Sequence, residues 1–248
     1  MDILEKVLIK NGFVFAFLLV GLIMVISYWV SDKLTNKKIP GVAIAIIAAM
    51  GLAFFGGKKG LADLPIFAGM AFLGGSMLRD FSVVATAMGA DLNKIKQAGP
   101  AGVVSLLVGV TFTFFVGVAI AYALGYRDAE SLVTIGAGAC TYIVGPVTGS
   151  AVGASSEIIT ISVAAGVVKT LVTTVLTPIF AKRIGLDNPH SAVVFGGLIG
   201  TSSGVAAGLA ATDPKLVPYG ALTATFYTGL GCLLCPSIFY FIVKAVVG

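Results

Sequence analysis

The chain has 248 residues, of which 58% are hydrophobic and only 11% are charged. Soluble domains carry about 25% charged residues, so this composition excludes a soluble globular protein and predicts an all-α integral membrane protein. The net charge of +5 is scattered over short loops instead of forming a basic patch. This pattern argues against nucleic acid as a partner and predicts the lipid bilayer as the surroundings.

Apolar runs mark the expected membrane spans, because a bilayer core of about 30 Å needs a long apolar helix. In chain order the runs are 13–30, 39–55, 64–78, 100–124, 158–181 and 219–247, of which the third is short. Apolar residues at three-and-four spacing predict an amphipathic connector helix over 81–97. We therefore expect residues 1–128 to form N-terminal spans that serve as a scaffold.

Two further segments, 131–154 and 191–211, are apolar but rich in glycine and hydroxyl residues, and the first also contains Pro146. Such residues disfavour a helix interior, and irregular backbone survives at membrane depth only inside protein or around a hydrated site. Each segment is long enough for one full span or for the two arms of a re-entrant hairpin. The protein is therefore expected to be a polytopic transporter with about six full spans plus hairpins, or with eight spans.

Both ambiguous segments lead into a capped long helix, so a hairpin-plus-helix unit is expected twice, over 131–181 and 191–247. Ser155 or Ser156 would cap the first long helix, and Asp213 with Pro214 at the first helical position would begin the second. We expect residues 129–248 to be the substrate-binding part of the chain.

The glycines of the second segment also permit a different interpretation. Four of them recur every four residues, namely Gly196, Gly200, Gly204 and Gly208. This spacing is typical of a straight, closely packed membrane helix. The loop charges favour hairpins. With two hairpins, nine Lys and Arg lie on one side of the membrane and six on the other; with two full spans the numbers are seven and eight. The hairpins would then enter from opposite faces, which is the inverted repeat of secondary transporters.

Lys169 is the only charged residue in the middle of an expected span. A lysine at a helix centre costs about 2.5 to 3.5 kcal/mol on insertion scales, so a function is favoured, namely a fixed cation for an anionic substrate. The alternatives are that Lys169 faces a partner subunit or extends its amine to the membrane surface.

Half-helices that end at the breaks would also direct backbone amides toward an anion. The candidate substrate-binding residues are Thr141, Tyr142, Gly145, Thr148, Gly149, Lys169, Thr201, Ser202, Ser203 and Gly204. The alternative for each hydroxyl is a hydrogen bond back to the preceding helical turn.

Uptake of an anion against a membrane potential needs a coupled cation. All eleven Asp and Glu residues lie at span ends or in loops, so sodium held by oxygen ligands is the better interpretation, with Thr141, Thr201 and Ser202 as candidate ligands. Asp80 and Glu157 are alternative proton carriers, and the choice between sodium and proton stays open. The sequence contains no nucleophile, base and acid set and no phosphate loop, so an enzyme is not expected.

The block 140–236 begins CTYIVGPVTGSAVGASSE and contains GTSSGVAAGLAA. It resembles the M subunit of the two-component malonate:sodium symporter (MadLM), and the resemblance extends over nearly the whole chain. More distantly, TYIVGPVTG and GTSSGVAAG, with TPIFAKRIGLDNP between them, resemble the LrgB/CidB family.

The first resemblance implies a multi-pass subunit of the bacterial inner membrane that imports malonate with sodium, without an organic cofactor. It also implies a small MadL-like membrane partner, while the oligomeric state, up to a higher oligomer, stays open. Two alternatives remain. One is a holin-like pore or organic-acid exporter subunit of the LrgB type, and the other is a structural subunit whose glycines pack helices.

Overall fold

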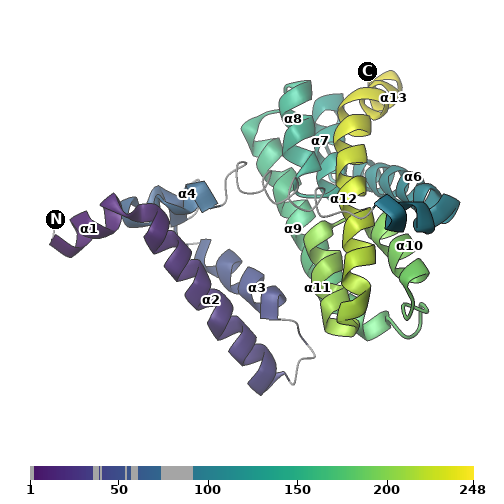
Figure 1. Ribbon diagram of the computed structural model, residues 1–248. Coiled ribbons are helices and arrows are strands. Elements are labelled where there is room, and N and C mark those ends of the chain that lie inside the picture. Colours follow the sequence, from purple (N-terminus) through teal and green to yellow (C-terminus); the bar gives the residue numbers. More distant parts are fainter. Residues whose placement is uncertain (1–2, 36–38, 40, 54, 57–60, 74–91) are drawn as a thin grey trace. The chain divides into compact units, whose positions relative to one another are not determined.

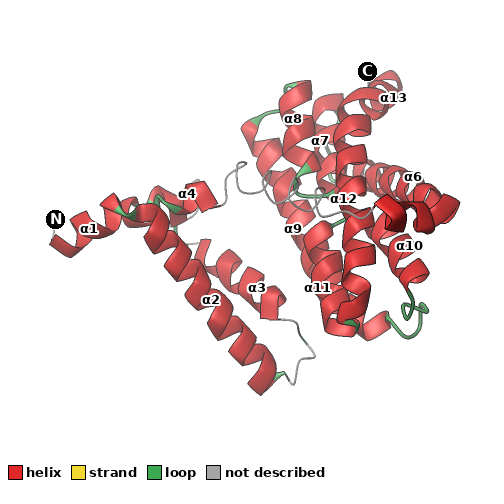
Figure 2. Cartoon of the chain, in the orientation of Figure 1, coloured by secondary structure: helices red, strands yellow, loops and turns green. Residues whose placement is uncertain are grey.

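The computed structural model describes residues 3–35, 39, 41–53, 55–56, 61–73 and 92–248, and every regular element within them is a helix (Figure 2). Four helices of this part of the chain are long and apolar enough to cross a membrane. They are Gly12–Leu34, Gly99–Ala123, Ser156–Phe180 and Pro214–Val247. The expected class, an all-α polytopic membrane protein, is confirmed.

The chain divides into two compact units, Met1–Gly89 and Ala90–Gly248. The first unit contains α1 (Ile3–Lys10), α2 (Gly12–Leu34), α3 (Gly41–Ala53), η1 (Leu61–Asp63), η2 (Pro65–Phe67) and α4 (Met70–Leu73). The boundary between the two compact units therefore lies between residues 89 and 90. The expected division at residue 128 separates a scaffold from a substrate-binding part, and it stays a prediction.

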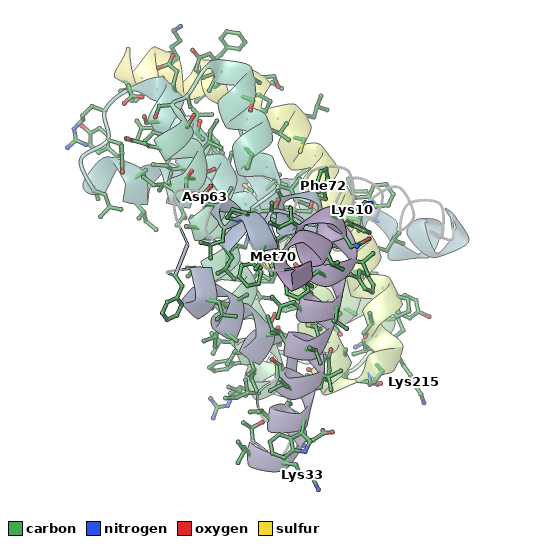
Figure 3. All side chains as sticks on the ribbon, turned by 90° about the vertical axis from the view of Figure 1, so that its left-hand side faces the viewer. Lys10, Lys33, Asp63, Met70, Phe72 and Lys215 are labelled. Atoms are coloured by element: carbon green, nitrogen blue, oxygen red, sulfur yellow. The ribbon has the colours of Figure 1, made fainter. Side chains whose placement is uncertain are left out.

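Helix α2 is the first expected span, and lysines mark its two ends. Lys10 is the last residue of α1, two positions before α2 begins, and Lys33 lies in the last turn of α2 (Figure 3). Charged side chains at these positions suit the membrane surface, because their amines can reach water while the helix between them stays in lipid.

The next two expected spans are less regular than α2. The run 39–55 is helical over Gly41–Ala53. In the run 64–78, the described residues form the short helical turns η2 and α4 instead of one helix, and Gly69, which disfavours a helix interior, lies between them. Residues 74–78, and 81–91 of the expected connector, lie outside the described residues.

The second unit contains α6 (Leu92–Ala123), α7 (Ala129–Cys140), α8 (Val144–Val152), α9 (Ser156–Phe180), α10 (Pro189–Ile199), α11 (Ser202–Thr212), η3 (Pro214–Leu216), α12 (Val217–Leu234), the π-helix η4 (Cys235–Phe239) and α13 (Tyr240–Val247) (Figure 1). Helix α6 is kinked at Gly99, whose φ of 61° and ψ of −167° are open essentially to glycine alone. The kink directly precedes the expected span 100–124.

The first ambiguous segment is a hairpin. Gly145 of α8 approaches Gly138 of α7, and Gly149 approaches Thr134, so the two helices run antiparallel. Helix α7 has 12 residues and is about 18 Å long, which is too short to cross a bilayer alone. Helix α9 follows, and its Ser162 contacts both Gly138 and Gly145. The hairpin therefore packs on α9 with both arms.

The second ambiguous segment is a hairpin as well, with its arms further apart. Gly196 of α10 lies against Gly220 of α12, and Gly220 also meets Val205 and Leu209 of α11. The short turn η3 joins α11 to α12 as antiparallel neighbours, and α10 runs in the same direction as α12 (Figure 1). Helix α12 therefore packs against both arms, as α9 does in the first hairpin.

The two hairpin-plus-helix units are inverted relative to one another. Helix α11 runs parallel to α9, because Gly204 lies beside Thr173 and Gly208 beside Thr177. Since α11 is antiparallel to α12, the long helices α9 and α12 point in opposite directions. Gly138 with Ser162 and Gly196 with Gly220 are equivalent contacts with the same sequence separation. These contacts confirm the expected inverted repeat.

Candidate functional site

The break in the first hairpin is built around Thr141, which ends α7 in an extended conformation and is 1% exposed. Its Oγ1 accepts hydrogen bonds from the backbone N–H groups of Ile143 and Val144, at 3.2 and 3.1 Å. The side chain thereby caps the start of α8, and both lone pairs of its oxygen are used. One O–H donor remains for another partner.

The break in the second hairpin consists of Gly200 and Thr201. Gly200 ends α10 with a φ of 78°, a left-handed conformation that glycine adopts without strain. Thr201 is the N-cap of α11, but its side chain makes no capping hydrogen bond to that helix. The first amides of α11 are therefore not capped by Thr201, in contrast to those of α8.

Both breaks lie against the middle of α9. Lys169 Nζ donates a hydrogen bond to the carbonyl oxygen of Cys140, the last residue of α7, at 2.9 Å. The next residue, Thr170, has its Oγ1 2.7 Å from Thr201 Oγ1 at the second break. Two consecutive residues of one long helix therefore contact the two breaks, at the depth where a membrane span has its midpoint.

Aromatic residues connect the breaks further. Tyr142 OH, from the first break, lies 3.5 Å from Ser203 Oγ of the second. Tyr227 of α12 is fully buried, its ring lies against Gly200, and Lys169 Nζ is 5.2 Å from the ring centroid. This distance is within the range of a cation–π interaction.

The hydroxyl hydrogens at the second break can be assigned by their partners. Thr170 Oγ1 donates to the carbonyl oxygen of Gly166 at 3.0 Å, which uses its only hydrogen. The 2.7 Å contact with Thr201 must then be donated by Thr201. Both lone pairs of Thr201 Oγ1 thus receive no hydrogen bond from the described residues. Thr201 presents an acceptor at this break, whereas Thr141 presents a donor at the other.

The predicted glycines of the site serve close packing. Gly145, Gly149 and Gly204 face Ser162, Thr134 and the carbonyl of Thr170 respectively, and a Cβ at any of them would collide with a neighbour. Thr148 is fully buried, and its hydroxyl finds no hydrogen-bond partner among the described residues. Ser202, in the first turn of α11, is half-buried beside Thr201.

Thr170, Tyr227 and the Cys140 carbonyl also lie at the two breaks, although sequence reasoning did not single them out. Thr170 follows Lys169 directly, and this adjacency was the available signal. Tyr227 and a backbone carbonyl carry no local pattern, so only the packed structure reveals them.

Other candidate groups lie elsewhere. Glu157 is exposed in the first turn of α9, roughly 18 Å along the helix from Lys169. Asp80 lies outside the described residues. An apolar groove of about 700 Å³ follows α6 and contains none of the hairpin residues; its lining is Leu107, Val108, Thr111, Phe112, Phe115, Val116 and Ala119.

The chain matches the family described as the malonate/sodium symporter MadM subunit over residues 4–247. Neither the curated proteins nor the solved structures contain a match to it. The family match covers both hairpins, both long helices that follow them and the N-terminal helices, and so confirms the resemblance to the M subunit of the malonate:sodium symporter. The chain therefore belongs to the malonate/sodium symporter MadM subunit family.

Proposed function

We propose that this chain is the substrate-binding subunit of a secondary transporter that imports malonate together with sodium, and that both bind between the hairpin breaks. The observation that carries the proposal is the pair Lys169 and Thr170, which brings a cation to one break and a hydroxyl pair to the other. Family membership supports malonate and sodium as the transported pair.

The donors around the breaks suit a small dianion. Lys169 has further N–H donors besides the one used on Cys140, and Thr141 keeps its O–H. Tyr142 and Ser203 lie at the exposed edge of the same region. The uncapped amides at the start of α11 add the positive end of a helix dipole. We assign the two carboxylates of malonate to this set of donors.

The acceptors around the second break suit sodium. Thr201 Oγ1 receives no hydrogen bond from the described residues, which leaves its two lone pairs open, and the carbonyls at the end of α10 carry the negative end of that helix dipole. Ser202 is adjacent and adds another oxygen. Hard cations prefer such oxygen ligands. Of the predicted sodium ligands, Thr201 and Ser202 fit this role, while Thr141 fits the anion because its lone pairs are occupied.

We further propose the cellular setting. The transporter would lie in a bacterial inner membrane, with residues 1–128 as scaffold and a small MadL-like membrane subunit as partner. Alternating access would move the hairpin pair of residues 129–248 against that scaffold. No catalytic residue is proposed.

Uptake of labelled malonate into proteoliposomes tests the proposal. The chain would be reconstituted alone and with a small partner subunit, under an inward sodium gradient and without sodium. Saturable, sodium-dependent uptake is expected, and Thr141→Val, Ser202→Ala and Ser203→Ala should each weaken it. Thr160→Val is the matched control, since Thr160 is an exposed threonine of α9 bonded to its own helix.

Two results would overturn the proposal. The first is unchanged uptake and sodium dependence in the three hydroxyl variants. The second is a sodium-independent, unsaturable leak of malonate, which would instead support an LrgB-like pore.

A further inference from the structure

We propose that the Lys169 ammonium is a tethered cation that takes, at the carbonyl end of α7, the place that sodium takes at the carbonyl end of α10. Removal of this lysine side chain should therefore open a second sodium site. This inference rests on the proposed function, because it requires that sodium binds at the second break.

The carbonyl ends of α7 and α10 share the same electrostatics. Both helices end at a break near the middle of the membrane, and each presents carbonyl oxygens that have no partner inside their own helix and together carry about half a negative charge. Buried carbonyls in a low dielectric need a partner. Each end therefore requires a positive group or a donor close by.

The two ends differ in the partners of their carbonyls. At α7, the Cys140 carbonyl accepts a hydrogen bond from Lys169 Nζ at 2.9 Å. Its repeat equivalent at α10 is the carbonyl of Leu198. Among the described residues, no ammonium or guanidinium group hydrogen-bonds a carbonyl at the end of α10, and the Leu198 carbonyl accepts no backbone hydrogen bond beyond its helix.

A tyrosine stands where the second repeat would place the lysine. Gly138 and Gly196, Ser162 and Gly220, and Lys169 and Tyr227 are equivalent pairs with one common sequence separation. Tyr227 is neutral, and its hydroxyl donates to the Gly109 carbonyl of α6 at 3.2 Å and not to a carbonyl of α10. Among the described residues, therefore, a cation lies at the carbonyl end of α7 and none lies at the carbonyl end of α10.

The carbonyl end of α10 has oxygen acceptors for a free cation. Thr201 Oγ1 offers two unused lone pairs directly after α10, and Thr170 holds that hydroxyl in place from α9. The first end has no such acceptor, since the lone pairs of Thr141 Oγ1 are taken by the amides of α8. The first break therefore suits the tethered ammonium of Lys169, and the second break suits a free sodium ion.

The test replaces Lys169 with threonine, which removes the charge and supplies an oxygen. Purified protein in detergent would be melted across a sodium series at constant ionic strength, with choline as the replacement cation. Each sodium that binds only the folded protein adds RT to the slope of stability against ln[Na⁺]. We expect this slope to rise by about one sodium in Lys169→Thr and to stay at the wild-type value in Lys169→Arg.

Lys182→Thr is the matched control. It removes the same charge just beyond the exposed end of α9, and its slope should equal that of the wild type. In proteoliposomes, the ratio of labelled sodium to labelled malonate transported should also rise by about one in Lys169→Thr. If Lys169→Thr does not fold, Lys169→Ser gives the same comparison with a smaller side chain.

An unchanged sodium slope in a folded Lys169 variant would overturn the inference while leaving the proposed function intact. The inference also fails if Lys169→Thr loses uptake at every sodium concentration and gains no sodium binding, because Lys169 would then act only as a counter-charge for malonate. A wild-type protein whose stability and uptake both ignore sodium would overturn the proposed sodium coupling itself, and this inference with it.

Discussion

The sharpest prediction concerns Thr201→Val, a substitution that keeps the shape of the side chain and removes one oxygen atom. In the wild type, Thr201 donates to Thr170 Oγ1 at 2.7 Å, and Thr170 donates onward to Gly166. After the substitution, Thr170 keeps its own acceptor, so no buried O–H loses its partner. The loss of one buried hydrogen bond should lower stability by only about 0.5 to 1.5 kcal/mol.

The effect on sodium should be larger than the effect on stability. Loss of residues that merely support a metal ligand typically weakens metal binding about 10- to 100-fold, and loss of a direct oxygen ligand should weaken it at least as much. We therefore expect the sodium concentration for half-maximal uptake to rise by at least about tenfold in Thr201→Val. At saturating sodium, the maximal rate of malonate uptake should stay near the wild-type value.

Thr174→Val is the control for the loss of a buried threonine hydroxyl. Thr174 is fully buried on α9, but its Oγ1 bonds only to the carbonyl of Thr170, so its removal should leave the sodium response unchanged. A shift below about twofold in Thr201→Val, or an equal shift in Thr174→Val, would show that Thr201 is not a sodium ligand.

Three further predictions concern packing, substrate binding and pH. Gly138→Ala should markedly lower the thermal stability of the protein in detergent, because its Cβ would lie 2.6 Å from the Ser162 Cα. Gly229→Ala, whose Cβ would meet no neighbouring atom within 4 Å, is the control and should leave the melting temperature unchanged. Equal melting temperatures of the two variants would contradict the hairpin packing. Tyr142→Phe should raise the malonate KM about tenfold at an unchanged sodium response, since a hydrogen bond to a charged group contributes about 1.5 to 3 kcal/mol; an unchanged KM would remove Tyr142 from the site. Hydrogen bonds from the side chain and the backbone N–H of Ser131 lower the pKa of Asp128. This carboxylate therefore stabilises the fold above its usual pKa, and the stabilisation is lost as pH falls through the lowered pKa. Asp128→Asn should make the melting temperature depend less on pH in the acid range, and an unchanged dependence would refute the assignment.

The positions of the helix starts were predictable from the sequence because capping is local chemistry. Ser155 accepts a hydrogen bond from Ile158 N at the start of α9, and Asp213 accepts one from Lys215 N before α12, as expected. The starts of α7 and α10 share a further signal that sequence reasoning did not use. Asp128 and Asn188 cap these helices, each bonding the backbone N–H of the third residue that follows.

The irregular third run was harder to predict, because apolar composition alone does not reveal where a helix is interrupted. Pro65 and Gly69 are present in the sequence of that run, yet equivalent residues are tolerated elsewhere, such as Pro178 within α9. The difference depends on whether neighbouring helices satisfy the freed backbone groups, which is a property of packing and not of the local sequence.

The class of the protein and the singular position of Lys169 could be established from the sequence, because apolar composition and charge are read directly from it. The two breaks could be predicted from glycine and proline only as one of two alternatives, since a straight, closely packed helix fitted the same residues. The roles of the polar groups, by contrast, depend on tertiary packing. Lys169 reaches a carbonyl 29 residues away, Thr170 a hydroxyl 31 away, and Tyr142 a serine 61 away. These contacts make one hydroxyl a donor and another an acceptor, and such roles arise only when distant segments pack together.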